Sequence, residues 1–65
     1  MIPRVKVLLL GSGGREHAIA WKLAQSPRLK KLFAAPGSDA MAAWAQNLPV
    51  DPADSEAVVK AARDC

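Results

Sequence analysis

Most of the residues that could bind a ligand lie in one glycine-rich stretch near the amino terminus, Gly11-Ser12-Gly13-Gly14-Arg15. A short apolar run precedes this stretch, and a helical pattern follows it. A strand that passes through glycines into a helix brings free backbone N–H groups and the positive end of the helix dipole to one point. Such a point binds phosphate, and a Cβ there would block the close approach of the anion. The stretch predicts a phosphate-binding loop, with a tight turn that binds nothing as the alternative.

The side chains around the loop each allow more than one interpretation. Arg15 at the start of a helix is repelled by the helix dipole, so a bound phosphate or an acidic partner would explain it. Glu16 suits the first turn whatever the function, and His17 is either a structural histidine or a substrate contact. Gly13 is expected at a positive φ or at a point of close approach, where a bulkier residue would strain the turn.

The dinucleotide-binding pattern G-x-G-x-x-G fits this loop only in part. Gly11 and Gly13 match its first two glycines, but the third position is Glu16. The pattern also requires an acidic residue at the end of the second strand, where it binds the adenosine ribose. The first carboxylate after that strand is Asp39, beyond Pro36-Gly37. The loop therefore suits a smaller phosphorylated ligand than a dinucleotide.

The elements on either side of the loop alternate between strands and helices. Val5–Leu10 is continuously apolar, which favours a strand covered on both faces, as in a parallel sheet. A helix is expected over Arg15–Gln25, with Ile19 and Leu23 four residues apart and small residues beside them. Ser26-Pro27 ends this helix, because proline disfavours helical geometry in the residue before it.

A second strand is expected over Lys31–Ala35, and Pro36-Gly37 closes it. Ser38 or Asp39 can then cap a short helix over Ala40–Ala45. The two tryptophans, one in each of these first two helices, are expected in the core or at a domain interface: Trp21 and Trp44.

The last part of the chain gives a weaker strand and a third helix. Asn47–Val50 is the strand candidate, and Asp51-Pro52 or Asp54 starts the helix. Four small or branched residues are spaced for one buried face of this helix: Ala57, Val58, Ala61 and Ala62.

This order predicts an α/β fold with a Rossmann-like parallel sheet wound by right-handed crossovers. The 65 residues form one domain at most, and a chain of this length buries only about 60% of its unfolded surface. A three-stranded parallel sheet would have two bare edges, one of them on the strand that should be central. We therefore expect residues 1–65 to be part of a longer chain.

Composition excludes several classes of protein. The chain has a single cysteine, the terminal Cys65, so it cannot form an internal disulfide. One cysteine and one histidine do not provide the spacing of a metal-ligand set, so no metal site is expected. The apolar run before Gly11 is too short for a signal peptide or a membrane span, which favours the cytoplasm and no membrane partner. The net charge of +3 is spread thinly along the chain. The only cluster of basic residues is Arg28, Lys30 and Lys31, and no aromatic platform accompanies it, so no nucleic-acid partner is expected.

A longer stretch of the chain resembles one known family. Gly11 to Pro27 reads G-S-G-G-R-E-H-A-I-A-W-K-L-A-Q-S-P and is similar to the amino terminus of phosphoribosylamine–glycine ligase, or glycinamide ribonucleotide synthetase. The resemblance extends through Ala35-Pro36-Gly37, like the family's A-P-G at the end of its second strand, and more loosely to Ala62. The family usually continues with Asn-Ala-Gly, whereas this chain has Ser38-Asp39-Ala40, and the chain ends before the family's fourth strand.

The resemblance implies part of a pre-ATP-grasp amino-terminal domain from an ATP-grasp ligase of de novo purine biosynthesis. In that family ATP phosphorylates the glycine carboxylate, and the amine of 5-phosphoribosylamine then attacks the acyl phosphate. The products are glycinamide ribonucleotide, ADP and phosphate. ATP and Mg²⁺ (or Mn²⁺) would bind in later ATP-grasp domains, which the 65 residues do not contain.

The amino-terminal domain of the family helps to hold the phosphoribosyl substrate. By motif match, Gly13 and Gly14 would donate backbone N–H groups to the ribose phosphate. The other residues that the resemblance implies are Gly11, Ser12 and Arg15, which would line the loop, and His17, Pro36 and Gly37 as further candidates for substrate contact. No catalytic residue is expected in this segment, and its partners would be 5-phosphoribosylamine, glycine and the rest of its own chain.

Two functions of other classes stay open at this point. One is a nicotinamide- or flavin-dependent oxidoreductase domain, against which Glu16 and the missing acidic strand end both count. The other is a non-catalytic module that uses the glycine-rich corner only for packing.

Overall fold

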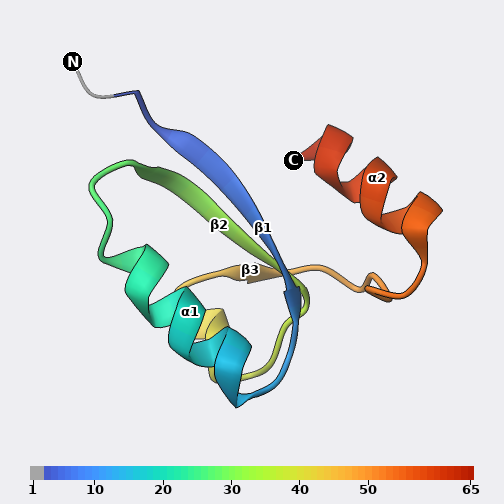
Figure 1. Ribbon diagram of the computed structural model, residues 1–65, viewed down its shortest axis with the longest axis horizontal. Coiled ribbons are helices and arrows are strands. Elements are labelled where there is room, and N and C mark those ends of the chain that lie inside the picture. Colours follow the sequence, from blue (N-terminus) through green and yellow to red (C-terminus); the bar gives the residue numbers. More distant parts are fainter. Residues whose placement is uncertain (1–2) are drawn as a thin grey trace.

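The computed structural model describes residues 3–65, which form a parallel three-stranded sheet with helices packed on it (Figure 1). The strands lie in the order β1-β2-β3. In chain order the elements are β1 (Val5–Gly11), α1 (Gly14–Ala24), β2 (Leu29–Pro36), the 3₁₀ helix η1 (Met41–Ala43), β3 (Gln46–Asn47) and α2 (Ser55–Asp64). The predicted α/β, Rossmann-like parallel sheet is confirmed.

Strand β3 is shorter and earlier than the predicted strand over residues 47–50. It pairs with β2 at only two positions, and the N–H of Leu48 adds one more bond, 2.7 Å, to the carbonyl of Ala34. The next N–H in phase to donate to β2 is that of Val50, which instead donates 2.8 Å back to the carbonyl of Leu48, so the ladder ends there. The prediction was wrong because it took the apolar residues at 48–50 as the strand.

The predicted helix over residues 40–45 is also reduced, to the three residues of η1. Of its two candidate caps, Ser38 makes the contact, because its Oγ accepts a hydrogen bond of 3.2 Å from the N–H of Met41. The short helix turns the chain directly from the end of β2 into β3.

Strand β2, rather than β1, is the buried centre of the sheet among the described residues. Leu32 to Ala35 are all buried, whereas Val5 and Leu10 of β1 are 54% and 40% exposed. The prediction that the first strand is covered on both faces is therefore wrong for this part of the chain. One face of β1 packs against the core through half-buried Val7 and Leu9, whereas α2 on the other side of the sheet has no buried residue and covers that face only loosely.

The core lies between the sheet and α1. Its buried residues come from the helix, the central strand and the segment around η1: Ala20, Leu32, Ala34, Met41 and Ala45. Ile19 is 40% exposed, so α1 meets the sheet through Ala20 and Leu23 instead. Trp44 packs against this core as predicted, but Trp21 is 51% exposed and lies outside it.

Helix α2 lies on the other side of the sheet from α1 and is packed more loosely (Figure 1). Asp54 caps it as predicted, accepting a hydrogen bond of 3.2 Å from the N–H of Ala57. The helix has no buried residue, and the predicted face is only half-buried at Ala57, Val58 and Ala61 and exposed at Ala62. A hollow therefore remains between α2 and Phe33 of the sheet. Within residues 3–65, no helix has the length and apolar character that crossing a membrane requires.

The register of the sheet brings two loops together. Gly11, the last residue of β1, is paired with Pro36, the last residue of β2. Because the strands are parallel, the loops that follow them leave the same edge of the sheet. The N–H of Gly37 donates a hydrogen bond of 3.1 Å to the carbonyl of Gly11 and so joins the two loops directly.

Candidate functional site

The first loop runs from the end of β1 into α1 through three glycines with different roles. Gly11 has φ +130°, a conformation that side chains rarely adopt, and a Cβ there would clash with the side chain of Glu16. Gly13 precedes the helix in an extended conformation, with φ −83° and ψ −177°. Gly13 therefore does not have a positive φ, and close approach is the alternative that fits this position, since a Cβ there would lie 3.0 Å from Oε2 of Glu16. Gly11 is the residue that needs glycine for its backbone conformation.

Glu16 lies folded back over this loop. Its Oε2 accepts a hydrogen bond of 3.0 Å from the N–H of Gly13, and its side chain lies against Gly11. This carboxylate in the first turn also interacts favourably with the helix dipole, which is the structural role expected from the sequence. A phosphate that used the N–H of Gly13 would have to displace Glu16.

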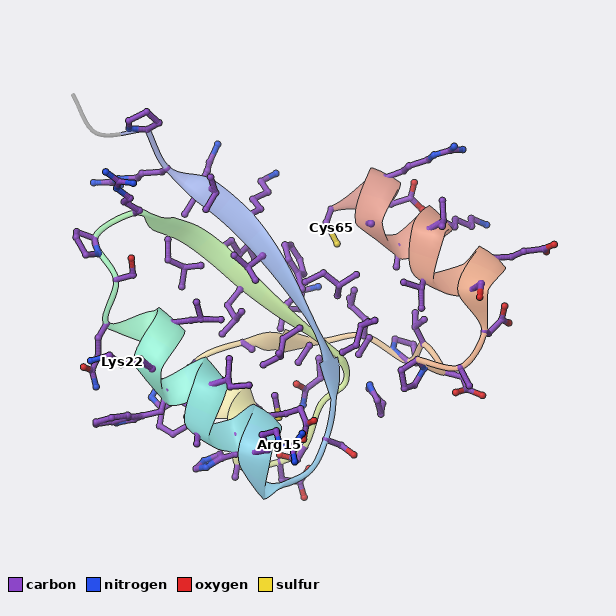
Figure 2. The ribbon with its side chains drawn as sticks, in the orientation of Figure 1. Arg15, Lys22 and Cys65 are labelled. Carbon is purple, nitrogen blue, oxygen red and sulfur yellow. The ribbon has the colours of Figure 1, made fainter. Side chains whose placement is uncertain are left out.

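The next donors of the helix are free. Among the described residues, no hydrogen bond uses the N–H groups of Gly14 and Arg15, which are among the unpaired donors of every helix start. A Cβ built on Gly14 meets nothing within 4 Å. The side chain of Arg15 projects from the same turn and is exposed (Figure 2). An anion in the open space beside Gly14 would meet two backbone donors and a guanidinium.

The second loop follows β2 and contains the other predicted contacts, Pro36 and Gly37. Pro36 is exposed, and Gly37 has φ +75°, in the left-handed region that favours glycine. The hydrogen bond from Gly37 to Gly11 places this loop beside the first. The structure therefore brings Gly11 to Arg15 and Pro36 to Gly37 to one corner of the sheet.

Asn47 contacts the second loop, and no pattern in the sequence assigns it a role at the site. Its Nδ2 donates a hydrogen bond of 2.8 Å to the carbonyl of Ser38, and a Cβ on Gly37 would clash with its carboxamide. Its Oδ1 is buried and has no donor among the described residues. An unsatisfied buried acceptor costs about 1–3 kcal/mol, so this atom requires an explanation.

His17, unlike the other predicted site residues, packs against an aromatic side chain instead of lying in one of the two loops. Its ring is half-buried and lies against Trp44, with ring centroids 4.8 Å apart and planes tilted by 47°. This packing joins α1 to the end of η1 and accounts for a histidine at this position. A substrate contact by His17 stays a prediction.

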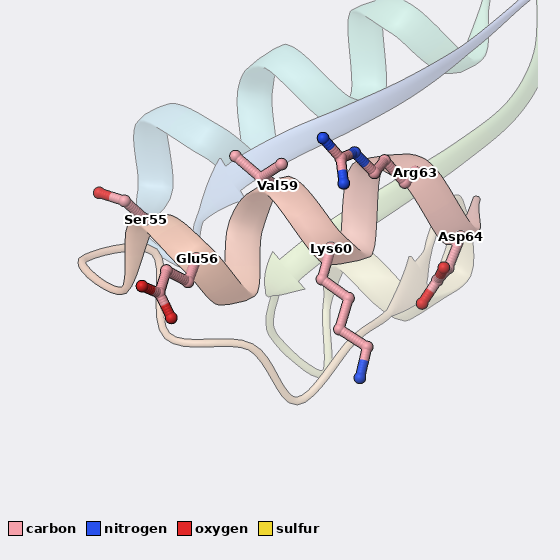
Figure 3. Close-up of a pocket in the computed structure, with 6 residues that line it drawn as sticks. All are labelled: Ser55, Glu56, Val59, Lys60, Arg63 and Asp64. Atoms are coloured by element: carbon pink, nitrogen blue, oxygen red, sulfur yellow. The ribbon is translucent and has the colours of Figure 1, made fainter.

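Two surface hollows occur elsewhere in residues 3–65, and neither lies at this corner. One is lined by Ser55, Glu56, Val59, Lys60, Arg63 and Asp64, which all project from α2 itself (Figure 3). A hollow with the side chains of one helix as its only wall offers little to enclose a ligand. No group of three or more His, Cys, Asp or Glu that could hold a metal ion occurs within the described part.

Comparison with known proteins decides the family. Residues 5–65 match the family model described as phosphoribosylglycinamide synthetase, N domain. The chain belongs to this family. The match includes both loops of the corner and α2, so every element described above falls within it.

Individual relatives of this N-domain family agree. A phosphoribosylamine–glycine ligase of Rhizobium meliloti is 58% identical over 55 residues, which cover 85% of this chain and 13% of the relative. The Agrobacterium fabrum ligase is 52% identical over 60 residues, 92% of this chain and 14% of its own length. The Rhodopirellula baltica ligase is 46% identical over 61 residues, which cover 94% of this chain and 14% of that ligase. The chain thus spans about one seventh of the length of these relatives.

Proposed function

We propose that this chain is the amino-terminal part of a ligase that joins glycine to 5-phosphoribosylamine in de novo purine biosynthesis. The observation that supports it best is the corner at the end of the sheet, within a domain of the synthetase family. There a helix start with free N–H groups and an exposed arginine faces open space beside Gly14.

The role of this part would be to bind the phosphoribosyl group. The phosphate would lie in the open space beside Gly14, where the backbone N–H groups of the first turn and Arg15 can donate to its oxygens. The N–H of Gly13 would join them once Glu16 moves away. Ser12, which is exposed in the loop, and Pro36 and Gly37 across from it would border the same ligand.

The reaction itself would take place beside this subsite. ATP would phosphorylate the carboxylate of glycine, giving an acyl phosphate and ADP, and the amine of phosphoribosylamine would displace phosphate to form the amide. ATP and Mg²⁺ (or Mn²⁺) would bind outside these 65 residues, and the described part has no group of three or more His, Cys, Asp or Glu that could hold a metal ion. The other partners would be glycine and the rest of the same polypeptide, and we place the enzyme in the cytoplasm on the sequence grounds given above.

The dinucleotide-binding alternative gains no support at the corner. Glu16 occupies the third position of that pattern and covers the loop, and Pro36 stands where the ribose-binding carboxylate should end the second strand. The donors at the corner, the N–H groups of Gly14 and Arg15, therefore support a phosphate site without the ribose-binding carboxylate of a dinucleotide site.

The proposal can be tested in a hybrid ligase in which residues 1–65 replace the matching segment of the Rhizobium meliloti enzyme. The hybrid should form ADP only when both glycine and phosphoribosylamine are present, whereas residues 1–65 alone should not. A soluble hybrid that unfolds cooperatively but shows no such activity would contradict the proposal.

A further inference from the structure

Asn47 connects the second loop to the framework of the sheet. Its backbone belongs to β3, where it is paired with Ala34 of the buried central strand, and the N–H of the next residue also donates to Ala34. Its side chain reaches in the other direction, to the carbonyl of Ser38 at 2.8 Å. One residue thus joins the buried central strand to the loop that borders the candidate subsite.

The contact with Gly37 fixes the loop from a second side. The carboxamide of Asn47 lies so close to Gly37 that a side chain on Gly37 would clash with it. Gly37 in turn donates its N–H to Gly11 in the glycine-rich loop. Asn47 thus contacts the second loop at two successive residues, Gly37 and Ser38, one of which is hydrogen-bonded to the first loop.

The orientation of the amide is set by its nitrogen. If the amide were reversed, Oδ1 would face the carbonyl of Ser38, and two acceptors would oppose each other at hydrogen-bonding distance. In the observed orientation Oδ1 is buried and finds no donor within residues 3–65. An apolar residue of the same size would avoid this unsatisfied oxygen, so packing alone does not explain an amide here.

We propose that Asn47 is a positioning residue for the phosphoribosylamine subsite: it holds the Gly37–Ser38 turn at the distance from the glycine-rich loop that the phosphoribosyl group requires. This inference rests on the proposed function. It adds a residue outside both loops, whose effect is transmitted through backbone contacts rather than through contact with the substrate.

The test uses two substitutions in the hybrid ligase. Asn47→Asp places an oxygen against the carbonyl of Ser38, and Asn47→Leu keeps the size of the side chain but removes the hydrogen bond. Both should raise the KM for phosphoribosylamine by about tenfold or more, with the KM for ATP within about twofold of the unchanged hybrid. Gln46→Glu is the matched control, because it makes the same change from amide to acid at the exposed neighbouring residue and should alter neither KM.

The two KM values separate positioning from loss of folded protein. A smaller fraction of folded enzyme lowers the apparent kcat but leaves each KM unchanged, so a substitution that merely destabilises the domain cannot produce the predicted difference. Unchanged KM values for both Asn47 variants, or equal increases for the two substrates, would overturn the inference while the proposed function stands. An inactive but folded hybrid with its native Asn47 would instead contradict the proposed function.

Discussion

At the scale of single residues, the three glycines of the first loop make separable contributions. Gly11 has a backbone conformation that other residues rarely adopt, Gly13 donates its N–H to Glu16, and Gly14 faces open space. Only at Gly14 does a new side chain enter the candidate phosphate subsite without disturbing the described structure. Substitution at Gly14 therefore examines ligand binding more cleanly than substitution at Gly13, where a Cβ would lie 3.0 Å from Oε2 of Glu16.

Gly14→Val in the hybrid ligase should raise the KM for phosphoribosylamine by about tenfold or more, because the isopropyl group occupies the space of the phosphate and removes charge-assisted hydrogen bonds. The KM for ATP should not change, and the unfolding temperature should stay close to that of the unchanged hybrid. Steady-state kinetics with each substrate varied in turn would measure this. Equal increases for ATP and phosphoribosylamine would show a general defect rather than a blocked subsite.

Gly11→Ala should act on stability instead. Its φ of +130° is strained for alanine and the new Cβ requires Glu16 to move, so we expect a loss of about 1–3 kcal/mol in the free energy of unfolding. Denaturant unfolding of the hybrid with Gly11→Ala and with Gly14→Ala would compare the two positions. A smaller loss for Gly11→Ala than for Gly14→Ala would show that the loop conformation is not what Gly11 provides.

Which of these residue roles could be predicted depended on how local they were. The loop, the acidic residue of the first turn and the Asp54 cap follow from patterns within a few residues of one another. Asn47 could not be found in this way, because its partner Ser38 lies nine positions earlier and they meet only through the pairing of β3 with β2. For Gly13 the sequence left a positive φ and a close approach open, because glycine alone does not reveal which residue of the turn has a positive φ.

At the scale of elements, both α-helices have a carboxylate near their start that accepts a backbone N–H, but of the two only α1 contributes a residue to the buried cluster. Glu16 serves α1, and Asp54 serves α2. Because α2 has no buried residue, its start should depend more heavily on its cap.

Asp54→Ala should therefore loosen α2 locally. Loss of the cap costs about 1 kcal/mol, which corresponds to about fivefold faster amide exchange along the helix. Hydrogen exchange of the hybrid, followed by mass spectrometry, would report α1 and α2 separately. Asp51→Ala is the control, since Asp51 accepts an N–H only within the preceding turn, from Ala53 at 2.9 Å. Equal effects of the two substitutions on α2 would contradict a specific role for the cap.

The type and order of the elements were predictable because apolar runs and helical spacing are local signals. Burial was less so. The apolar faces of α1 and α2 and the first strand are less buried than expected. The sequence shows which residues are apolar but does not show which neighbours cover them. The early end of β3 could not be predicted either, because it depends on the N–H of Val50 turning back to the carbonyl of Leu48 instead of reaching β2.

At the scale of the whole molecule, the described residues leave two edges of the sheet without a partner strand. The outer edge of β1 carries exposed Val5 and Leu10, and β3 is only two residues long. Isolated residues 1–65 should therefore associate or stay partly ordered. Sedimentation velocity over a range of concentrations, together with thermal unfolding, would measure this. A monomer with a sharp, concentration-independent, two-state transition would show that the 65 residues are complete as a folding unit.

The central claim is that the corner at the end of β1 binds the phosphate of the substrate, and hydrogen exchange of the hybrid ligase with ribose 5-phosphate tests it most directly. Ribose 5-phosphate has the phosphoribosyl group and lacks the reacting amine, so binding can be followed without turnover. We expect slower exchange over residues 11–17 as its concentration rises, with no change in α2 and no such effect from NAD. Saturable binding that leaves the exchange of residues 11–17 unchanged, or equal protection by NAD, would contradict the account.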